Sequence, residues 1–128
     1  MGCFWSKEEK KNFYLSKIIG QRAETITFLA LKQLRGENKI TDFEKYDCYG
    51  TDFKIKYQDN IIKLQTKSSL AGAQYHQKKY PDIPVIIVHC SHLPSRRKTT
   101  LKKRVQSTKE KILAALSMVN SNERLILV

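Results

Sequence analysis

In the segment GTDFKIKYQDNIIKLQTKSS, residues 50–69, three side chains are of types that suit a common site: the acid Asp52, the amide Gln65 and Lys67. Asp52 offers carboxylate oxygens, which hard divalent cations prefer as ligands. Gln65 offers an amide oxygen, which can also bind a metal but carries a dipole in place of a full charge. Lys67 supplies a positive charge for an anion such as a phosphate. If the fold brings these side chains together, they would converge on one ion or one phosphate.

Two alternating segments would position these side chains on a β-hairpin. Apolar and polar residues alternate in TDFKIKY and again in NIIKLQTKS, which is the period of a half-buried strand. With Asp59 and Asn60 as the loop residues, the register places Asp52 opposite Lys67 and places Gln65 diagonal to Asp52. Taken alone, the hairpin favours a blander interpretation, in which its polar face is a solvated row of charges with an ordinary Asp–Lys pair.

Hydrophobic patterning predicts the remaining elements of the chain. Steps of three and four between apolar residues indicate helices, and an unbroken apolar run indicates a buried strand. The expected elements are a helix over 16–34, a strand over 39–46, the two hairpin strands, a helix over 68–80, a buried strand over 83–90, a long helix over 101–119 and a short strand over 124–128. The order α-β-β-β-α-β-α predicts an α/β fold with a mixed sheet covered by helices, in one domain over 1–128.

The chain is strongly basic, with 24 Lys and Arg against 12 Asp and Glu and a formal net charge of +12. This balance points to a polyanionic partner, with DNA as the leading candidate, although a solubility role or a site for anionic lipid stays open. The C-terminal part of the chain is the more basic one, and the helix predicted over 101–119 would carry a basic face opposite its apolar stripe, formed by Lys102, Lys103, Arg104, Lys109 and Lys111. The candidate phosphate-contacting residues are Lys78, Lys79, Arg96, Arg97, Lys98, Lys102 and Lys103.

Several classes of protein are disfavoured by the sequence. The longest apolar run, Val85 to Val88, is far too short to cross a membrane. Three cysteines form no CxxC pair, which fits a reducing cytosol, so we expect a cytoplasmic protein without a membrane partner. No P-loop, nucleophile-elbow or zinc-finger spacing is present.

The combined pattern resembles the PD-(D/E)xK nuclease superfamily, whose restriction-endonuclease-like core is α-β-β-β-α-β. The family carries an Asp at the second strand, here in Thr51-Asp52, and an acid-x-Lys on the third strand, here Gln65-Thr66-Lys67. GQRAE, ending at Glu24, is similar to the first-helix segment of archaeal Holliday-junction resolvases. A Q-x-K variant is also found in Mrr-type restriction enzymes and in a cyanobacterial intron-encoded homing endonuclease. The resemblance covers a core over about 16–90 and leaves out the basic C-terminal helix and tail, 96–128.

The resemblance implies an endodeoxyribonuclease that uses Mg²⁺, for which Mn²⁺ can substitute, and that leaves a 5′-phosphate and a 3′-hydroxyl. The implied catalytic residues are Glu24, Asp52, Gln65 and Lys67. Asp52, Gln65, Glu24 and the main-chain carbonyl of Thr66 would be the metal ligands, with Glu24 binding directly or through water. As an alternative, Glu24 is a surface acid of the helix. Because glutamine replaces an acid, we expect the cation to be held less tightly.

Three functions are compatible with these residues. The leading prediction is sequence-specific double-strand cleavage of the restriction or homing type; the alternatives are a Holliday-junction resolvase and a non-catalytic nucleic-acid-binding module. Two cuts need two sites, so we expect a homodimer or a higher symmetric homo-oligomer. The apolar stripe from Leu101 to Val119 and the closing RLILV are candidate interface elements, or they pack on their own core.

Overall fold

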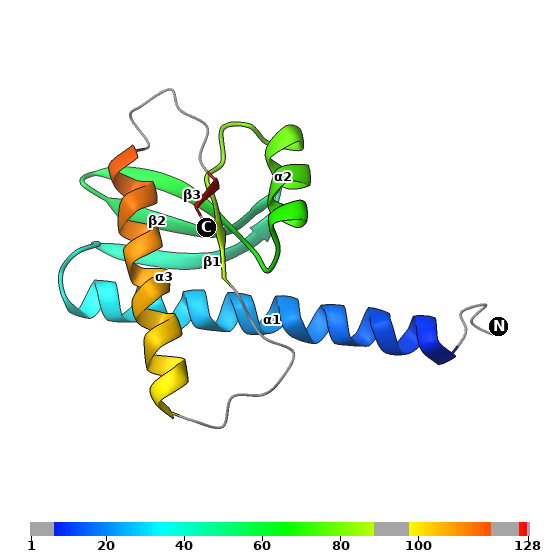
Figure 1. Cartoon of the computed structure of the whole chain (residues 1–128). Coiled ribbons are helices and arrows are strands. Elements are labelled where there is room, and N and C mark those ends of the chain that lie inside the picture. The colour runs from blue at the N-terminus through cyan, green and yellow to red at the C-terminus, as the bar shows by residue number, and fades with distance from the viewer. Residues whose placement is uncertain (1–6, 89–97, 119–125, 128) are drawn as a thin grey trace.

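The computed structural model describes residues 7–88, 98–118 and 126–127 (Figure 1). The elements are α1 (Lys7–Gly36), β1 (Asp42–Cys48), β2 (Thr51–Tyr57), β3 (Asn60–Lys67), α2 (Leu70–Lys79), β4 (Val85–Ile87), α3 (Lys98–Met118) and β5 (Ile126–Leu127). This is the element order that the sequence predicts, with the short closing strand included, and the α/β class is confirmed. Among the described helices, none combines the length and the apolar character that a membrane crossing needs.

The five strands form one mixed sheet in the order β1-β2-β3-β4-β5. The β1, β2 and β3 strands are antiparallel neighbours, whereas β4 runs parallel to β3 and β5 runs parallel to β4. Helices α1 and α3 share one core with the sheet, and α2 packs against the opposite face through a small cluster of Ala73, Val85 and Ile87. The sheet is therefore a middle layer with helices on both sides (Figure 1).

Helix α1 is longer than the predicted helix over 16–34, and its apolar stripe forms the main contact with the sheet. Ala23, Ile26, Ala30 and Leu34 follow one another in steps of three or four, and all four side chains are buried. The helix ends at Gly36, as predicted, and Asn38 takes the left-handed backbone conformation just beyond it. The chain then enters β1 at residue 42, which places this strand later than the predicted 39–46.

The hairpin register differs from the prediction. The two loop residues are Gln58 and Asp59, both with positive φ (48° and 65°), and not Asp59 and Asn60. Phe53 therefore pairs with Leu64. This register places the largest buried apolar side chains of the two strands directly opposite each other, which explains why it is preferred.

A shift of two residues leaves every side chain on its predicted face but changes its partner. The β2–β3 ladder ends at Phe53 and Leu64, and one further step along the two strands puts Asp52 opposite Gln65. The predicted direct opposition of Asp52 and Lys67 is wrong, and Lys67 lies diagonal to Asp52.

Helix α3 packs on its own core through the predicted stripe. Val105, Thr108, Ile112 and Ala115 are buried against α1 and the sheet, whereas Leu101 is exposed. Strand β5, from the RLILV segment, pairs with β4 of the same chain. Both candidate interface elements thus have partners within the chain; Val119 lies outside the described residues.

The basic face predicted for α3 is only partly solvated. Lys109 was expected on this face, but it is 7% exposed and forms an ion pair with Glu37, beyond the end of α1. Lys111 donates a hydrogen bond to the Ile87 carbonyl oxygen at 2.7 Å. Lys109 thus connects α3 to the turn after α1, and Lys111 connects α3 to β4, because an ammonium that is partly removed from water needs a hydrogen-bonding partner.

Candidate metal centre

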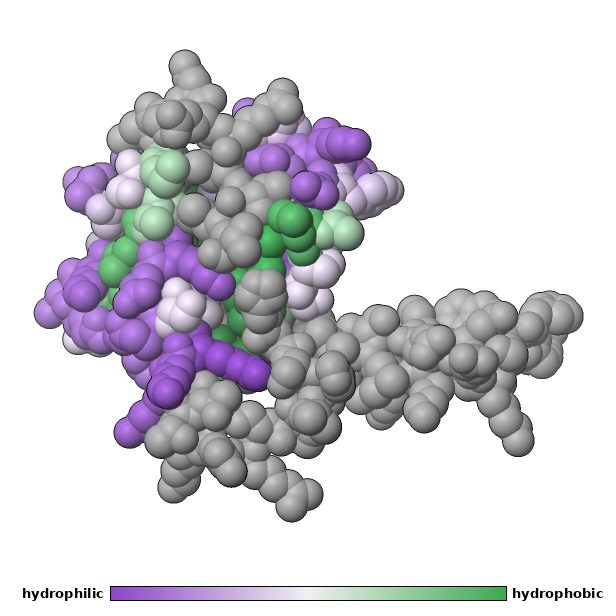
Figure 2. Space-filling model, in the orientation of Figure 1, coloured by the Kyte–Doolittle hydropathy of each residue, from purple (hydrophilic) through white to green (hydrophobic). Residues whose placement is uncertain are grey.

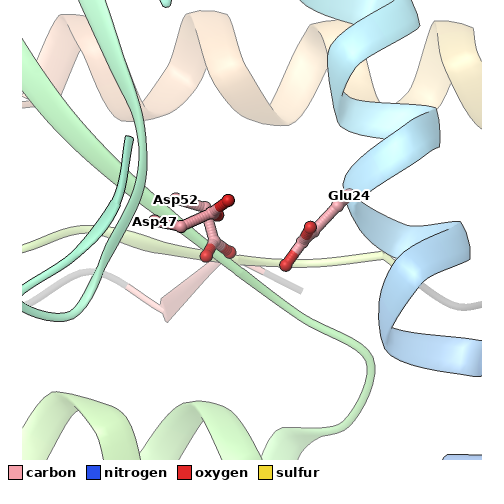
Figure 3. Close-up of side chains that lie close together, drawn as sticks. All are labelled: Glu24, Asp47 and Asp52. Carbon is pink, nitrogen blue, oxygen red and sulfur yellow. The ribbon is translucent and has the colours of Figure 1, made fainter. Parts of the chain in front are cut away.

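Three carboxylates from three elements converge at one end of the sheet. Glu24 extends from α1 toward Asp47, near the end of β1, and Asp52, near the start of β2 (Figure 3). One oxygen from each residue lies within 4.8 Å of the others. Asp52 is buried, Glu24 is half-buried and Asp47 is exposed. The structure thus brings together two of the predicted site residues, Glu24 and Asp52, and adds a third acid that the sequence analysis missed.

The missing acid, Asp47, reaches the site because β1 is irregular. The pairing of β1 with β2 shifts between Lys45 and Cys48, which inserts extra backbone just before the turn. The sequence DCYG indicated only a turn, and no local pattern distinguishes a turn aspartate from one that an irregular strand turns toward a neighbour. The useful signal was spacing, since Asp47 lies five residues before Asp52 across a tight turn.

Helix α2 fixes that turn in place. Gly50 has a φ of +72°, and a Cβ atom there would lie 2.5 Å from the ring of Tyr80. His76 Nε2 lies 2.7 Å from the Gly50 carbonyl oxygen, and the His76 ring lies against the Tyr80 ring with centroids 5.1 Å apart. Glycine is required here by both its backbone conformation and its close neighbour.

His76 acts as a neutral hydrogen-bond donor in this contact. Burial lowers the pKa of His76, and the nearby charges of Lys67 and Lys79 lower it further. The neutral ring therefore carries its proton on Nε2, which donates to the Gly50 carbonyl oxygen. The other ring nitrogen, Nδ1, is buried without a partner in the part of the chain that the structure describes.

Asp52 takes the place of a backbone partner at the point where β2 and β3 separate. Asp52 Oδ2 accepts a hydrogen bond from the Thr66 amide at 3.0 Å. The backbone amide of Gln65 donates to the Pro84 carbonyl oxygen, and the Lys67 carbonyl oxygen accepts from the Val88 backbone amide. These two residues therefore bond to the β4 side. Because the backbone groups of successive residues point to opposite sides of a strand, the Thr66 amide points toward β2 and donates to the Asp52 carboxylate.

The protonation equilibrium of Asp52 reflects a crowded, dry site. Burial raises the pKa of Asp52 to about 6, and the negative charges of Glu24 and Asp47 add to the increase. The Thr66 amide and the positive charge of Lys67 act in the opposite direction. Three carboxylates at this separation repel one another, and a divalent cation would remove that repulsion.

Gln65 contributes an amide oxygen that lacks a protein partner. The side chain is 7% exposed, and its Oε1 accepts no hydrogen bond from any described residue. Its Nε2 lies 3.5 Å from the Thr66 carbonyl oxygen, at the long limit of a hydrogen bond. An unpaired buried oxygen is costly, and Gln65 lies across the hairpin from Asp52, so its Oε1 is a candidate for a further oxygen ligand. These hard oxygen donors fit Mg²⁺ or Mn²⁺.

Two lysines lie at this end of the sheet. The Lys67 side chain passes along Gly72 of α2, where its Cδ would lie 3.7 Å from an added Cβ, and its charge acts on Asp52. Among the residues that the structure describes, no carboxylate forms an ion pair with Lys67 within 4.0 Å. Lys45, which the sequence analysis did not single out, has its Nζ 3.5 Å from Glu24 Oε2 and 3.7 Å from Asp47 Oδ2.

A cleft of about 500 Å³ opens beside the acids, between α1 and the first two strands. It is lined by Gln21, Glu24, Thr25, Phe28, Lys45 and Phe53. Because the lining includes Glu24 of the acidic cluster and Lys45, which contacts that cluster, a molecule in the cleft would contact the site directly. The cleft thus provides access for a substrate.

The predicted phosphate-contacting lysines lie on two helices. Lys78 and Lys79 are exposed on α2, and Lys102 and Lys103 are exposed on α3. Figure 2 shows hydrophilic surface over both helices. Lys98 begins α3, but its side chain lies outside the described residues, as do Arg96 and Arg97.

No family model, curated protein or solved structure matches this chain. The site's own residues must therefore carry the functional argument. Their arrangement combines oxygen ligands for a hard cation, a lysine on the adjoining strand and an open cleft, which together suit hydrolysis of a phosphate ester.

Proposed function

We propose that this chain is a Mg²⁺-dependent DNA endonuclease of the PD-(D/E)xK superfamily, in its Q-x-K variant. The observation that carries the proposal is the convergence of Glu24, Asp47 and Asp52 within 4.8 Å of one another. This convergence joins elements distant in sequence, and the Q-x-K segment lies on the neighbouring strand. An acid that lies on the surface by chance has no reason to lie beside a buried carboxylate, as Asp47 lies beside Asp52.

The sheet topology supports the same assignment. A first helix is followed by three antiparallel strands, a second helix and a strand parallel to the third. This is the α-β-β-β-α-β order of the restriction-endonuclease-like core. The β2–β3 ladder ends next to Asp52, which is where a substrate phosphate would approach in this proposal.

Each residue has a chemical task in this proposal. Asp52, Glu24, Asp47 and the Gln65 amide oxygen would hold Mg²⁺, which supplies positive charge against the negative charge that develops on the phosphate. Asp52 is ionised above its pKa of about 6, so the site is ready near neutral pH. Lys67 orients or deprotonates the attacking water, or neutralises charge on the phosphate.

The basic composition supports DNA as the substrate. The net charge of +12 and the exposed lysines on α2 and α3 suit contact with a phosphate backbone on more than one side of the site. We propose sequence-specific double-strand cleavage, with a symmetric homo-oligomer supplying a second site. Cleavage of a four-way junction is the alternative substrate.

Incubation of the purified chain with linear duplex, supercoiled plasmid and a four-way junction tests this function. We expect cleavage with Mg²⁺, none with EDTA, and 5′-phosphate ends. Preferred cutting of the junction would replace the sequence-specific enzyme with a resolvase. Binding without Mg²⁺-dependent cutting of any substrate would contradict the proposal and leave a nucleic-acid-binding module.

A further inference from the structure

Lys45 places an ammonium group directly on the acidic cluster. Its Nζ lies 3.5 Å from Glu24 Oε2 and 3.7 Å from Asp47 Oδ2, so one positive charge contacts two of the three acids. Lys45 pairs with Phe53 across the β1–β2 ladder, and Phe53 faces the α1 core. The strand therefore directs Lys45 toward α1 and Glu24, and the contact follows from the register.

The two ion pairs involve the same carboxylates that a metal would need. Oxygen ligands lie about 2.1 Å from Mg²⁺, so a cation bound by Glu24 and Asp47 would lie within a few ångströms of the ammonium. The ammonium and the cation would repel each other, because contact with the same oxygens places two positive charges close together. Lys45 and a divalent cation thus compete for one position.

We propose that Lys45 is a built-in competitor of the divalent cation, which holds the acids together before the cation binds and leaves when it arrives. The proposal rests on the function proposed above, since it assumes that the acids bind a cation. Lys45 sets the cation concentration at which the site fills. A protein with this device stays inactive until the divalent cation reaches that concentration.

The Lys45 side chain can move as the proposal requires. Its side chain is 53% exposed, and the two ion pairs are its only ion pairs among the described residues. Exposed lysine pairs are weak and exchange readily with water. Lys45 also lines the 500 Å³ cleft, so the released ammonium stays beside the space where a phosphodiester would lie. Displacement by the cation therefore makes a positive charge available to the substrate.

A Mn²⁺ titration of the protein without nucleic acid tests the competition between Lys45 and the cation. Electron paramagnetic resonance measures the free ion at each step. We expect Lys45→Met to bind Mn²⁺ about five- to twentyfold more tightly than the wild type, because it removes two exposed ion pairs. Lys45→Arg, which keeps the charge, should stay within about threefold of the wild type.

Lys54→Met is the matched control. Lys54 lies on the neighbouring strand and pairs with Glu44, and its Nζ lies 3.7 Å from the ring centroid of Tyr46. The substitution removes the same charge from the sheet without touching the acids. It should change the Mn²⁺ affinity by less than about twofold, which separates a local contact from a general effect of net charge.

The outcomes distinguish this inference from the proposed function. Tighter binding by Lys45→Met alone supports the inference. Equal Mn²⁺ affinity of the wild type, Lys45→Met and Lys54→Met overturns the inference. If Asp47→Asn then loses Mn²⁺ binding, the acids still bind the cation, and the proposed function stands. No binding by either the wild type or Lys45→Met overturns both the inference and the cation site.

Discussion

The two ends of the β2–β3 hairpin are stabilised by different interactions. At the turn end, the ladder is regular from Phe53–Leu64 to Tyr57–Asn60, and apolar partners face the core. At the open end, a carboxylate replaces the strand partner of Thr66. The same two strands thus form a regular apolar ladder at one end and a buried polar site at the other.

The open end contains buried groups that a stable core would avoid. Asp52 is 8% exposed and Gln65 is 7% exposed, and the Gln65 side-chain oxygen accepts no hydrogen bond from the described residues. Thr51 Oγ1 is also buried without a described partner. Polar groups left in this state cost stability, and their presence beside a regular ladder fits the cation site that we propose at this end.

The largest difference between the two ends should appear in the cleavage rate when a lysine is replaced at each end. Lys67→Met at the open end should lower the Mg²⁺-dependent cleavage rate about a thousandfold, because Lys67 acts on the water or the phosphate. Lys63→Met, an exposed lysine of the same strand in the turn half, should change the rate by less than about threefold. Initial rates on a cleaved substrate measure both. Equal losses would mean that both lysines act only through general DNA affinity.

Removal of the buried charge should make the protein more stable while making it inactive. In EDTA at pH 7.5, Asp52→Asn should raise the free energy of unfolding by about 1–3 kcal/mol, because it keeps an acceptor for the Thr66 amide and removes a disfavoured charge. Asp59→Asn at the turn should change it by less than about 0.5 kcal/mol. Urea denaturation measures both variants.

The effect of Asp52 on stability should depend on pH in a defined direction. Its pKa in the folded protein, about 6, lies above its ordinary value of 3.8, so the folded state binds the proton more tightly. The stabilising contribution of the protonated group is complete below pH 3.8 and is lost as the pH rises to 6. The advantage of Asp52→Asn should therefore shrink as the pH falls from 7 toward 4. An advantage that grows on acidification would contradict the assigned burial.

An acid in place of Gln65 on the third strand should strengthen cation binding. Gln65→Glu adds a full negative charge beside Asp52, so the Mg²⁺ concentration for half-maximal cleavage should fall about five- to tenfold. Asn60→Asp makes the same chemical change at the turn end and should leave that concentration unchanged. A loss of cleavage in Gln65→Glu would assign Gln65 a role through hydrogen bonding.

The turn end should accept improvement without loss of function. Asp59 has a φ of +65°, a conformation that glycine adopts without strain. Asp59→Gly should raise the free energy of unfolding by about 0.5 kcal/mol and leave the cleavage rate unchanged. Thermal or urea unfolding together with the cleavage assay checks the expectation. A reduced cleavage rate would show that the two ends are coupled.

The sequence predicted faces better than partners. Alternation assigned Asp52, Gln65 and Lys67 to one face of the hairpin, because the side-chain period of a strand is two. It could not choose between Gln58-Asp59 and Asp59-Asn60 as loop residues, since both loops have the same length and shift the register by two. Direct pairing of Phe53 with Leu64 decided the register, and that preference depends on tertiary packing.

The acids of the site were only partly predictable. Glu24 was found through its resemblance to a first-helix segment, and helix geometry brings it to the sheet. Asp47 depends on an irregular strand that no local pattern encodes, and the Lys45 contact depends on where α1 places Glu24. Lys109 was assigned to a solvated face because helical spacing cannot reveal that Glu37 provides an ion-pair partner there.

A plasmid-nicking assay of the wild type and Asp52→Asn tests the central claim most directly. The wild type should nick with Mg²⁺ and not with EDTA. Asp52→Asn should lower the nicking rate at least a hundredfold while its affinity for the same DNA in EDTA stays within about twofold of the wild type. Equal Mg²⁺-dependent rates for the two proteins would contradict the claim that Asp52 and its neighbouring carboxylates form the catalytic cation site.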